Sequence, residues 1–234
     1  MRLVCFPHAG AGASSFFAWG QALPPEIEVC SALMPGRESR IAEVPFTRMA
    51  PLVERLATAL EPWLDRECAF FGHSLGALVA FELARELARR GLPLPRRLFL
   101  SGRRAPTLPL EGDLLHPLPD EELVEQIRVR YGGIPREILN EPELVRYFLP
   151  VIRADVELFE TYTCEPGPPL ACPFSLYNGR DDHQVSETGV EAWRQLTSAG
   201  FEARRFPGGH FYLHEYRQEV LTALAADLQL PTGR

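Results

Sequence analysis

The sequence has few cysteines, and none of them are spaced as in a metal or redox site. Its five cysteines are scattered and odd in number, with no Cys-x-x-Cys pair. This pattern excludes a disulfide framework, and we expect each thiol to act as a small buried apolar group in a reducing compartment. The five are Cys5, Cys30, Cys68, Cys164 and Cys172.

Long apolar runs and an excess of positive charge are also missing. The longest apolar stretch, 68–84, contains His73 and Glu82 and is interrupted by glycines, which excludes a membrane span. The net charge of −7 argues against nucleic acid and against an anionic membrane as partners. Met1 and Arg2 lead directly into the first predicted strand, so we expect no signal peptide and a cytoplasmic protein.

What is present is the composition of a soluble globular enzyme. The chain has 234 residues, of which 46% are hydrophobic and 24% are charged, enough for one domain with a full core. Short apolar runs alternate with amphipathic helices, which predicts an α/β fold with a mostly parallel, doubly wound sheet. We predict strands at 3–6, 27–34, 69–71, 97–101, 174–177 and 202–206, and helices at 49–63, 75–90, 120–131, 143–163 and 213–228.

The alternation of strands and helices stops at about 105–172. This stretch has a proline-rich entry and two predicted helices but no evident strand. In an α/β sheet such an insertion predicts a helical lid over the carboxyl ends of the strands, where these folds bind ligands, within a single domain 1–234. The lid aromatics either line an acyl pocket or simply pack the lid onto the body. They are Tyr131, Tyr147, Phe148, Phe159 and Tyr162.

The stretch Gly72-His73-Ser74-Leu75-Gly76 lies between a predicted buried strand and a predicted buried helix. A serine on a tight strand-to-helix turn forms a nucleophile elbow, in which side chains at the two glycine positions would clash. The turn lifts the Ser74 hydroxyl off the sheet. It also places the Leu75 N–H at a helix N-terminus, where it can stabilise an oxyanion.

An activated serine needs a base and an acid that orients the base, and two later loops supply both. Asp181 and Asp182 follow the predicted strand 174–177, and His210 follows the strand 202–206. The order Ser, Asp, His is that of α/β-hydrolase triads. We prefer Asp182 because Val185 can then anchor the loop, and Asp181 remains the alternative. His210 and His214 have the spacing of a zinc pair, but no Glu follows His210 and no third ligand is evident, so we predict no metal site.

Taken together, these motifs resemble the type II thioesterases that accompany polyketide and nonribosomal peptide synthetases, which are editing enzymes of the α/β-hydrolase superfamily. The resemblance covers nearly the whole chain, in order. The matching stretches are Phe6-Pro7-His8-Ala9-Gly10, Pro35-Gly36-Arg37-Glu38, 72–76, Ser101-Gly102-Arg103, Arg153-Ala154-Asp155, 179–185 and Gly209-His210-Phe211.

The resemblance implies an α/β-hydrolase fold with a helical lid. It also implies an acyl-[carrier protein] thioesterase that removes stalled or misprimed acyl groups from the phosphopantetheine arm of carrier proteins. By position, Ser74 would be the nucleophile, His210 the base and Asp182 its orienter. The N–H groups of Leu75 and Ala9 would form the oxyanion hole. No cofactor is expected, since the phosphopantetheine belongs to the partner.

The implied partners are acyl or peptidyl carrier protein domains, which are usually acidic. Candidate docking cations are Arg37, Arg40, Arg103 and Arg104, although ordinary solvated arginines would look the same. We expect a monomer. The alternatives are a thioesterase of fatty-acid synthesis, a generic carboxylesterase and, in another class, an inactive subunit that binds carrier proteins. The intact set of Ser74, Asp182 and His210 argues against an inactive subunit.

Overall fold

The computed structural model describes residues 1–132 and 141–228 and contains one six-stranded sheet. All neighbouring strands in it are parallel, and their order is β2-β1-β3-β4-β5-β6. The strands are β1 (Arg2–Phe6), β2 (Glu28–Ser31), β3 (Cys68–His73), β4 (Leu98–Ser101), β5 (Phe174–Gly179) and β6 (Phe201–Phe206). The chain runs outward from β1 to β2 and then returns to β3, so the strand order reverses beside β1. This confirms the predicted α/β class.

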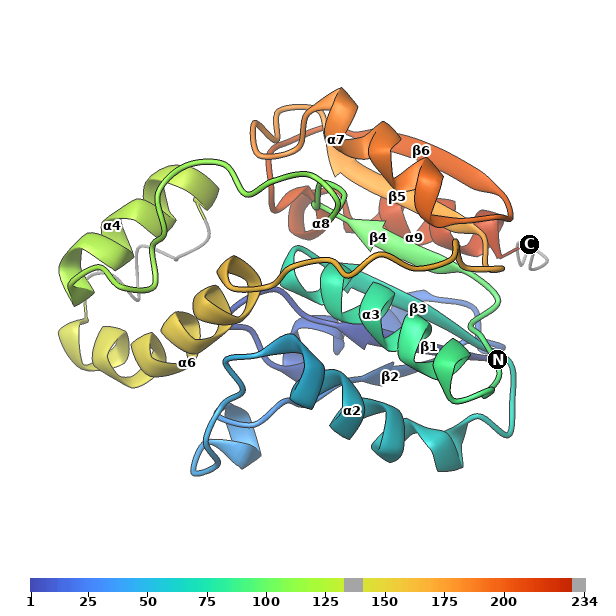
Figure 1. The fold of residues 1–234 in the computed structure, drawn as a ribbon, viewed down its shortest axis with the longest axis horizontal. Helices are drawn as coiled ribbons and strands as arrows, with labels where there is room; N and C mark the ends of the chain where they lie inside the picture. Colours follow the sequence, from blue (N-terminus) through green and yellow to red (C-terminus); the bar gives the residue numbers. More distant parts are fainter. Residues whose placement is uncertain (133–140, 229–234) are drawn as a thin grey trace.

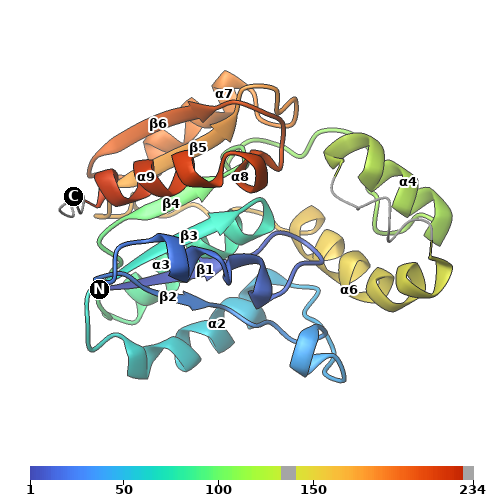
Figure 2. The same ribbon diagram turned by 180° about the vertical axis from the view of Figure 1, so that it is seen from behind.

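Helices cover both faces of the sheet. α2 (Met49–Leu60) and α3 (Leu75–Arg89) lie in front of it in Figure 1, and α9 (Arg217–Asp227) lies in front in Figure 2. The short helices are α1 (Trp19–Ala22), α7 (Glu187–Glu191) and α8 (Tyr212–Glu215). Of these, α1 contacts α9. The central strands are therefore buried on both sides, and this is why their sequences are continuously apolar rather than alternating.

Consecutive strand residues feed two separate cores. Phe70 and Leu98 pack in the core beneath α2 and α3, whereas Phe71 and Phe99 pack in the core beneath α1 and α9. This division follows from the period of two along a strand. Burying one such side chain contributes about 1.5–3 kcal/mol, so the two cores hold the helices onto the sheet from both sides.

Some predicted elements are shorter or more divided than expected. β2 covers only Glu28–Ser31 of the predicted 27–34, because the chain leaves the edge of the sheet after Ala32 bonds to Cys5 O. The predicted helix 143–163 ends at Glu160. The predicted closing helix 213–228 is broken at Tyr216, whose φ of −105° and ψ of 30° are not helical.

Between β4 and β5 the chain forms α4 (Asp120–Tyr131) and α6 (Pro142–Glu160), which project beyond the carboxyl ends of the strands (Figures 1 and 2). In 105–132 and 141–172 the only β-structure is an isolated bridge between Leu170 and Thr197. The second half of α6 packs on the body, since Ala154 and Leu158 are buried. The insertion thus covers the edge of the sheet where ligands bind in this class of fold.

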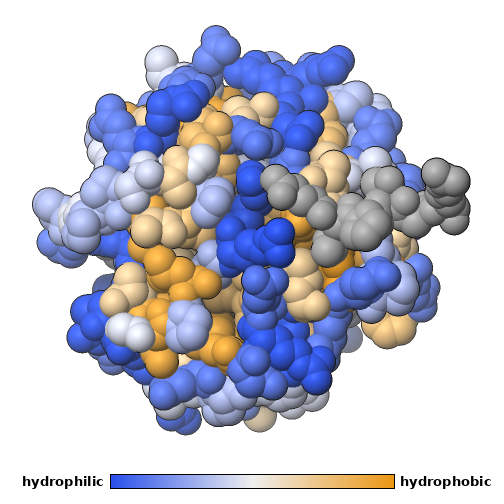
Figure 3. Space-filling model, turned by 90° about the vertical axis from the view of Figure 1, so that its right-hand side faces the viewer, coloured by the Kyte–Doolittle hydropathy of each residue, from blue (hydrophilic) through white to orange (hydrophobic). Residues whose placement is uncertain are grey.

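Figure 3 shows the end of the molecule opposite α4 and α6, where hydrophilic and hydrophobic residues are intermixed. Among the described residues, no helix combines the length and the apolar character needed to cross a membrane.

Candidate active site

Ser74 occupies the tight turn between β3 and α3 that the sequence predicts. Its φ of 55° and ψ of −112° lie outside the regions that side chains favour. A Cβ at Gly72 would lie 2.0 Å from Gly76 O, and one at Gly76 would lie 2.0 Å from Phe6 O. Only glycine fits at these two positions, so local sterics explain both the motif and the strained serine.

The structure brings His210 and Asp182 together. His210 Nδ1 lies 2.7 Å from Asp182 Oδ2, and both side chains are buried. The second oxygen, Asp182 Oδ1, accepts a hydrogen bond from Gln184 N at 3.0 Å. Asp181, the alternative acid, is exposed. This arrangement fixes the His210 tautomer with the proton on Nδ1 and leaves Nε2 free to take a proton.

The loops that carry this pair approach each other closely. A Cβ at Gly179 would lie 2.3 Å from Gly209 O. Arg180 N and Asp181 N donate to Phe206 O and Gly208 O, which join the ends of β5 and β6. Backbone contacts therefore set the distance between Asp182 and His210, whose positions are 28 residues apart.

Two backbone N–H groups near the cavity that Ser74 lines have no acceptor in the described part of the chain. One belongs to Leu75, the first residue of α3, and the other to Ala9 in the loop after β1. Orphan donors at a helix N-terminus are suited to binding an anion.

A cavity of about 460 Å³ lies beneath the lid and includes Ser74 and His210. There is no hydrogen bond between these two side chains, although both line the cavity, and catalytic hydrogen bonds are often long before substrate binds. The lid contributes mostly apolar side chains to the wall. These are Ile127, Tyr131, Phe148, Ile152, Val156 and Phe159.

Three of the five predicted lid aromatics thus reach the cavity. Of the other two, Tyr147 is 53% exposed on the lid surface. Tyr162 donates a hydrogen bond to Glu82 at 2.5 Å in a different part of the molecule. Whether an aromatic side chain lines the cavity depends on where it lies in the fold. The number of aromatic residues in the sequence does not indicate this.

A smaller, more polar cavity of about 180 Å³ also includes Ser74 and His210. Arg103 is part of its wall, with its guanidinium 5.0 Å from the centre of the Phe159 ring. Burial lowers the pKa of Arg103, and its Nε has no hydrogen-bond partner among the described residues. Ser74 therefore faces both an apolar and a polar compartment.

Two neutral histidines, His8 and His73, lie near the pair of His210 and Asp182. Burial lowers the pKa of His8 to about 3, with smaller contributions from His214, His210 and Arg37. Burial also lowers the pKa of His73, whose Nδ1 lies 2.8 Å from Ser101 Oγ. Neither ring therefore carries a positive charge that would compete with a proton on His210.

The prediction of Arg37 as a docking cation is wrong. Arg37 cannot contact a partner protein because it is 4% exposed and paired with Asp155. His116 is paired in a similar way, since its Nδ1 lies 2.7 Å from Glu160 Oε2. Both partners lie on α6, far along the chain, and no local sequence pattern indicates such pairs.

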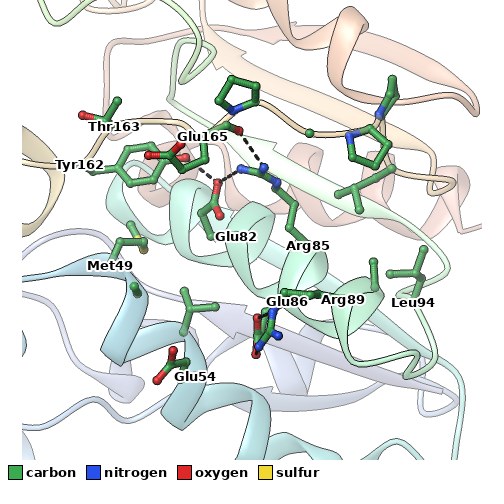
Figure 4. A pocket seen from close by; sticks show the side chains of 18 of the residues that line it. Met49, Glu54, Glu82, Arg85, Glu86, Arg89, Leu94, Tyr162, Thr163 and Glu165 are labelled. Carbon is green, nitrogen blue, oxygen red and sulfur yellow. Dashed lines mark hydrogen bonds and ion pairs between the residues drawn. The ribbon is translucent and has the colours of Figure 1, made fainter.

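Another cavity, of about 1130 Å³, lies elsewhere, between α2, α3 and the segment 161–171. Figure 4 shows Glu82 and Arg85 on α3 facing Tyr162, with Arg85 Nη2 donating to Glu165 O at 2.7 Å. None of Ser74, Asp182 and His210 lines it, so we do not include it in the candidate site.

Comparison with known proteins identifies the family of this chain. A family model described as a thioesterase domain matches residues 1–228. The gramicidin S biosynthesis protein GrsT of Aneurinibacillus migulanus is 40% identical over 230 residues, covering 98% of this chain and 90% of that protein.

Solved structures give the same result. RedJ, a thioesterase from the prodiginine pathway of Streptomyces coelicolor, has a TM-score of 0.90 and 42% identity, covering 96% of this chain and 84% of RedJ. The type II thioesterase BorB from the borrelidin cluster has a TM-score of 0.88 and 39% identity, covering 96% of this chain and 91% of BorB. With a family model matched over nearly its full length, the chain belongs to the thioesterase family.

Proposed function

We propose that this protein is a type II thioesterase of polyketide or nonribosomal peptide biosynthesis that hydrolyses acyl groups from the phosphopantetheine arm of carrier proteins. The observation that carries the proposal is the buried pair of His210 and Asp182, 2.7 Å apart, beside a strained Ser74 in a cavity beneath the lid. The similarity to GrsT, RedJ and BorB supports the choice of pathway.

In this mechanism His210 Nε2 takes the proton of Ser74 Oγ as the oxygen attacks the thioester carbonyl carbon. The C–S bond of the tetrahedral intermediate then breaks, and the arm leaves as a thiol with the proton held by His210. A water molecule, deprotonated by His210, then attacks the acyl-serine carbonyl carbon. The bond to Ser74 Oγ breaks, His210 returns the proton to Oγ, and the acid is released. Asp182, which contacts His210 Nδ1, stabilises the imidazolium in both steps.

The negative charge on the carbonyl oxygen would be stabilised by the Leu75 and Ala9 N–H groups. Removing one such donor from an enzyme typically costs roughly 10²–10³ in rate. The leaving thiol has a pKa near 8.5, so it departs far more readily than an amine and depends less on protonation.

The two compartments at Ser74 suit the two halves of the substrate. The apolar cavity beneath the lid matches an acyl chain, whose burial is favourable at about 25 cal/mol per Å². The polar cavity lined by Arg103 matches the amides of the pantetheine arm, since a buried guanidinium needs hydrogen-bond acceptors.

The direct test compares two substrates with the same acyl group. Acetyl-loaded carrier protein and acetyl-N-acetylcysteamine are incubated with the enzyme and followed by mass spectrometry, with Ser74→Ala as control. We expect faster release from the carrier protein, lost in Ser74→Ala while the variant stays folded.

Each of the other outcomes would contradict a different part of the proposal. Release from the small thioester alone would leave the mechanism standing but indicate a generic hydrolase. Normal hydrolysis by Ser74→Ala would refute the nucleophile. Absence of turnover, together with failure of a fluorophosphonate to label Ser74, would indicate an inactive subunit that binds carrier proteins.

A further inference from the structure

Arg37 and Asp155 form an ion pair beside the candidate active site that is almost completely buried. Arg37 Nη2 lies 2.9 Å from Asp155 Oδ1, Arg37 Nη1 lies 2.9 Å from Asp155 Oδ2, and the side chains are 5% and 2% exposed. Arg37 follows β2, and Asp155 lies on α6, 118 residues further along. Because desolvating two charges costs several kcal/mol per ion, such a pair is a weak source of stability and suggests a more specific use.

Both members of the pair also hold the loop after β1. Gly10 N donates to Asp155 Oδ2 at 2.7 Å, and Arg37 Nη1 donates to Ala11 O at 3.0 Å. One charged pair thus binds a donor and an acceptor on adjacent residues of the same turn.

The geometry of this turn sets the direction of the Ala9 N–H. Ala11 N donates to His8 O at 3.1 Å, which closes the turn. The His8 carbonyl and the Ala9 N–H belong to one planar trans peptide, so they point in opposite directions. With His8 O held inside the turn, the Ala9 N–H points out of it and has no acceptor among the described residues.

The lid helix also supports the turn sterically. Gly10 has a φ of +77°, and a Cβ there would lie 2.7 Å from Ile152 Cγ1 on α6. The loop after β1 reaches the part of α6 nearest the sheet (Figures 1 and 2). Backbone and helix are therefore in contact where Asp155 binds Gly10.

We propose that Asp155 and Arg37 are positioning residues for the oxyanion hole, which the lid helix α6 thereby helps to build. The inference rests on the proposed function, in which the Ala9 N–H binds the oxyanion. Asp155 and Arg37 hold the turn 8–11, and through it the direction of that N–H, without touching the substrate themselves.

The test is Asp155→Asn, which keeps the size of the side chain but removes the charge that pairs with Arg37. With acetyl-N-acetylcysteamine as substrate we expect kcat to fall by about 10- to 100-fold, because a misdirected donor weakens an interaction made mainly in the transition state. KM is expected to stay within about threefold of the wild-type value, since the ground state depends little on that donor.

Inhibitor binding separates positioning from general structural damage. A trifluoromethyl ketone, which forms an oxyanion on Ser74, is expected to bind Asp155→Asn more weakly by the same factor as the loss in kcat/KM. The corresponding thioether, which has no carbonyl, is expected to bind equally well to both proteins. Equal binding of the ketone to both proteins, or a kcat within twofold of wild type, would overturn the inference.

Glu157→Gln is the matched control. Glu157 lies on the same helix and pairs with Arg48 on the body, but its side chain forms no hydrogen bond or ion pair with the turn 8–11. We expect its kcat and ketone affinity to match the wild type. If Glu157→Gln lost as much kcat and ketone affinity as Asp155→Asn, any substitution that loosens α6 would have this effect. That result would overturn the specific role of Asp155.

Arg37→Lys provides a second route if Asp155→Asn does not fold. It keeps the charge but cannot bind both Asp155 oxygens and Ala11 O together, so the same selective loss of kcat is expected. Failure of the proposed function is recognised separately, because the wild-type protein would then not hydrolyse the thioester or Ser74→Ala would remain active.

Discussion

His8 lies in a group of rings beside Ser74, and this burial makes its protonation costly. Its ring centre is 4.9 Å from that of Phe211 and 5.9 Å from that of His73. The pKa of His8 falls from 6.5 to about 3, first because of burial and then because of the neighbouring histidines and Arg37. His8 is thus neutral at neutral pH, at the expense of stability in acid.

The sign of the pH effect follows from linkage. Between pH 6.5 and about 3 the unfolded chain protonates His8 and the folded protein does not. The unfolded state therefore binds more protons, and the free energy of unfolding decreases as the pH falls through this range.

We expect His8→Gln to flatten this dependence. The wild-type slope from His8 is at most about 1.4 kcal/mol per pH unit, and the variant lacks this contribution. Urea unfolding at pH 7, 6 and 5 measures it, with the exposed His183→Gln as control. Parallel curves for the wild type and His8→Gln would contradict the assignment.

At the scale of elements, the base of the lid is held by a second carboxylate on α6. Glu160 accepts hydrogen bonds from Leu115 N at 2.7 Å and His116 N at 3.0 Å, and its side chain is 3% exposed. Arg153, two turns earlier on the same face of α6, donates to the carbonyls of His116 and Leu118. The segment between β4 and α4 is therefore fastened to α6 by side chains rather than by backbone ladders.

Glu160→Gln is expected to loosen this segment. The amide oxygen can replace one carboxylate oxygen, but the NH₂ group then faces a backbone donor, which costs about 1–3 kcal/mol. Limited proteolysis with mass spectrometry is expected to show faster cleavage within 105–119. The control is Glu125→Gln, which removes only an exposed pair with Arg128; equal cleavage in both variants would contradict the anchoring role.

At the scale of the whole molecule, β3 connects the two cores through adjacent residues. Phe70 packs 5.6 Å from Phe6 in one core, and Phe71 packs 4.6 Å from Trp19 in the other, measured between ring centres. Both phenylalanines are completely buried. We therefore expect the cores on both faces of the sheet to contribute to the stability of the fold.

Phe70→Ala and Phe71→Ala are therefore expected to destabilise the protein to a similar degree. Each leaves a large cavity in a close-packed core and costs about 3–5 kcal/mol. The free energy of unfolding in urea measures both. A cost below 1 kcal/mol for either variant would show that one layer contributes little to the folded state.

Much of the fold was predictable from the sequence because its signals are local. The helix predicted at 120–131 is observed as α4 (Asp120–Tyr131), with Gly132 in the left-handed conformation at its end. The elbow at Ser74 follows from two glycines and a strand-to-helix switch within a few residues. Backbone sterics and apolar periodicity act over such short distances, so neighbouring residues are enough to specify them.

The tertiary structure alone decided which distant groups meet. It paired His210 with Asp182 rather than Asp181, and it buried Arg37 against Asp155 although the sequence suggested an exposed docking cation. It also broke the closing helix at Tyr216 and divided the space at Ser74 into two cavities. These outcomes depend on how α6 and the loops of β5 and β6 pack together, and packing between segments far apart in the chain leaves no periodic pattern in either of them.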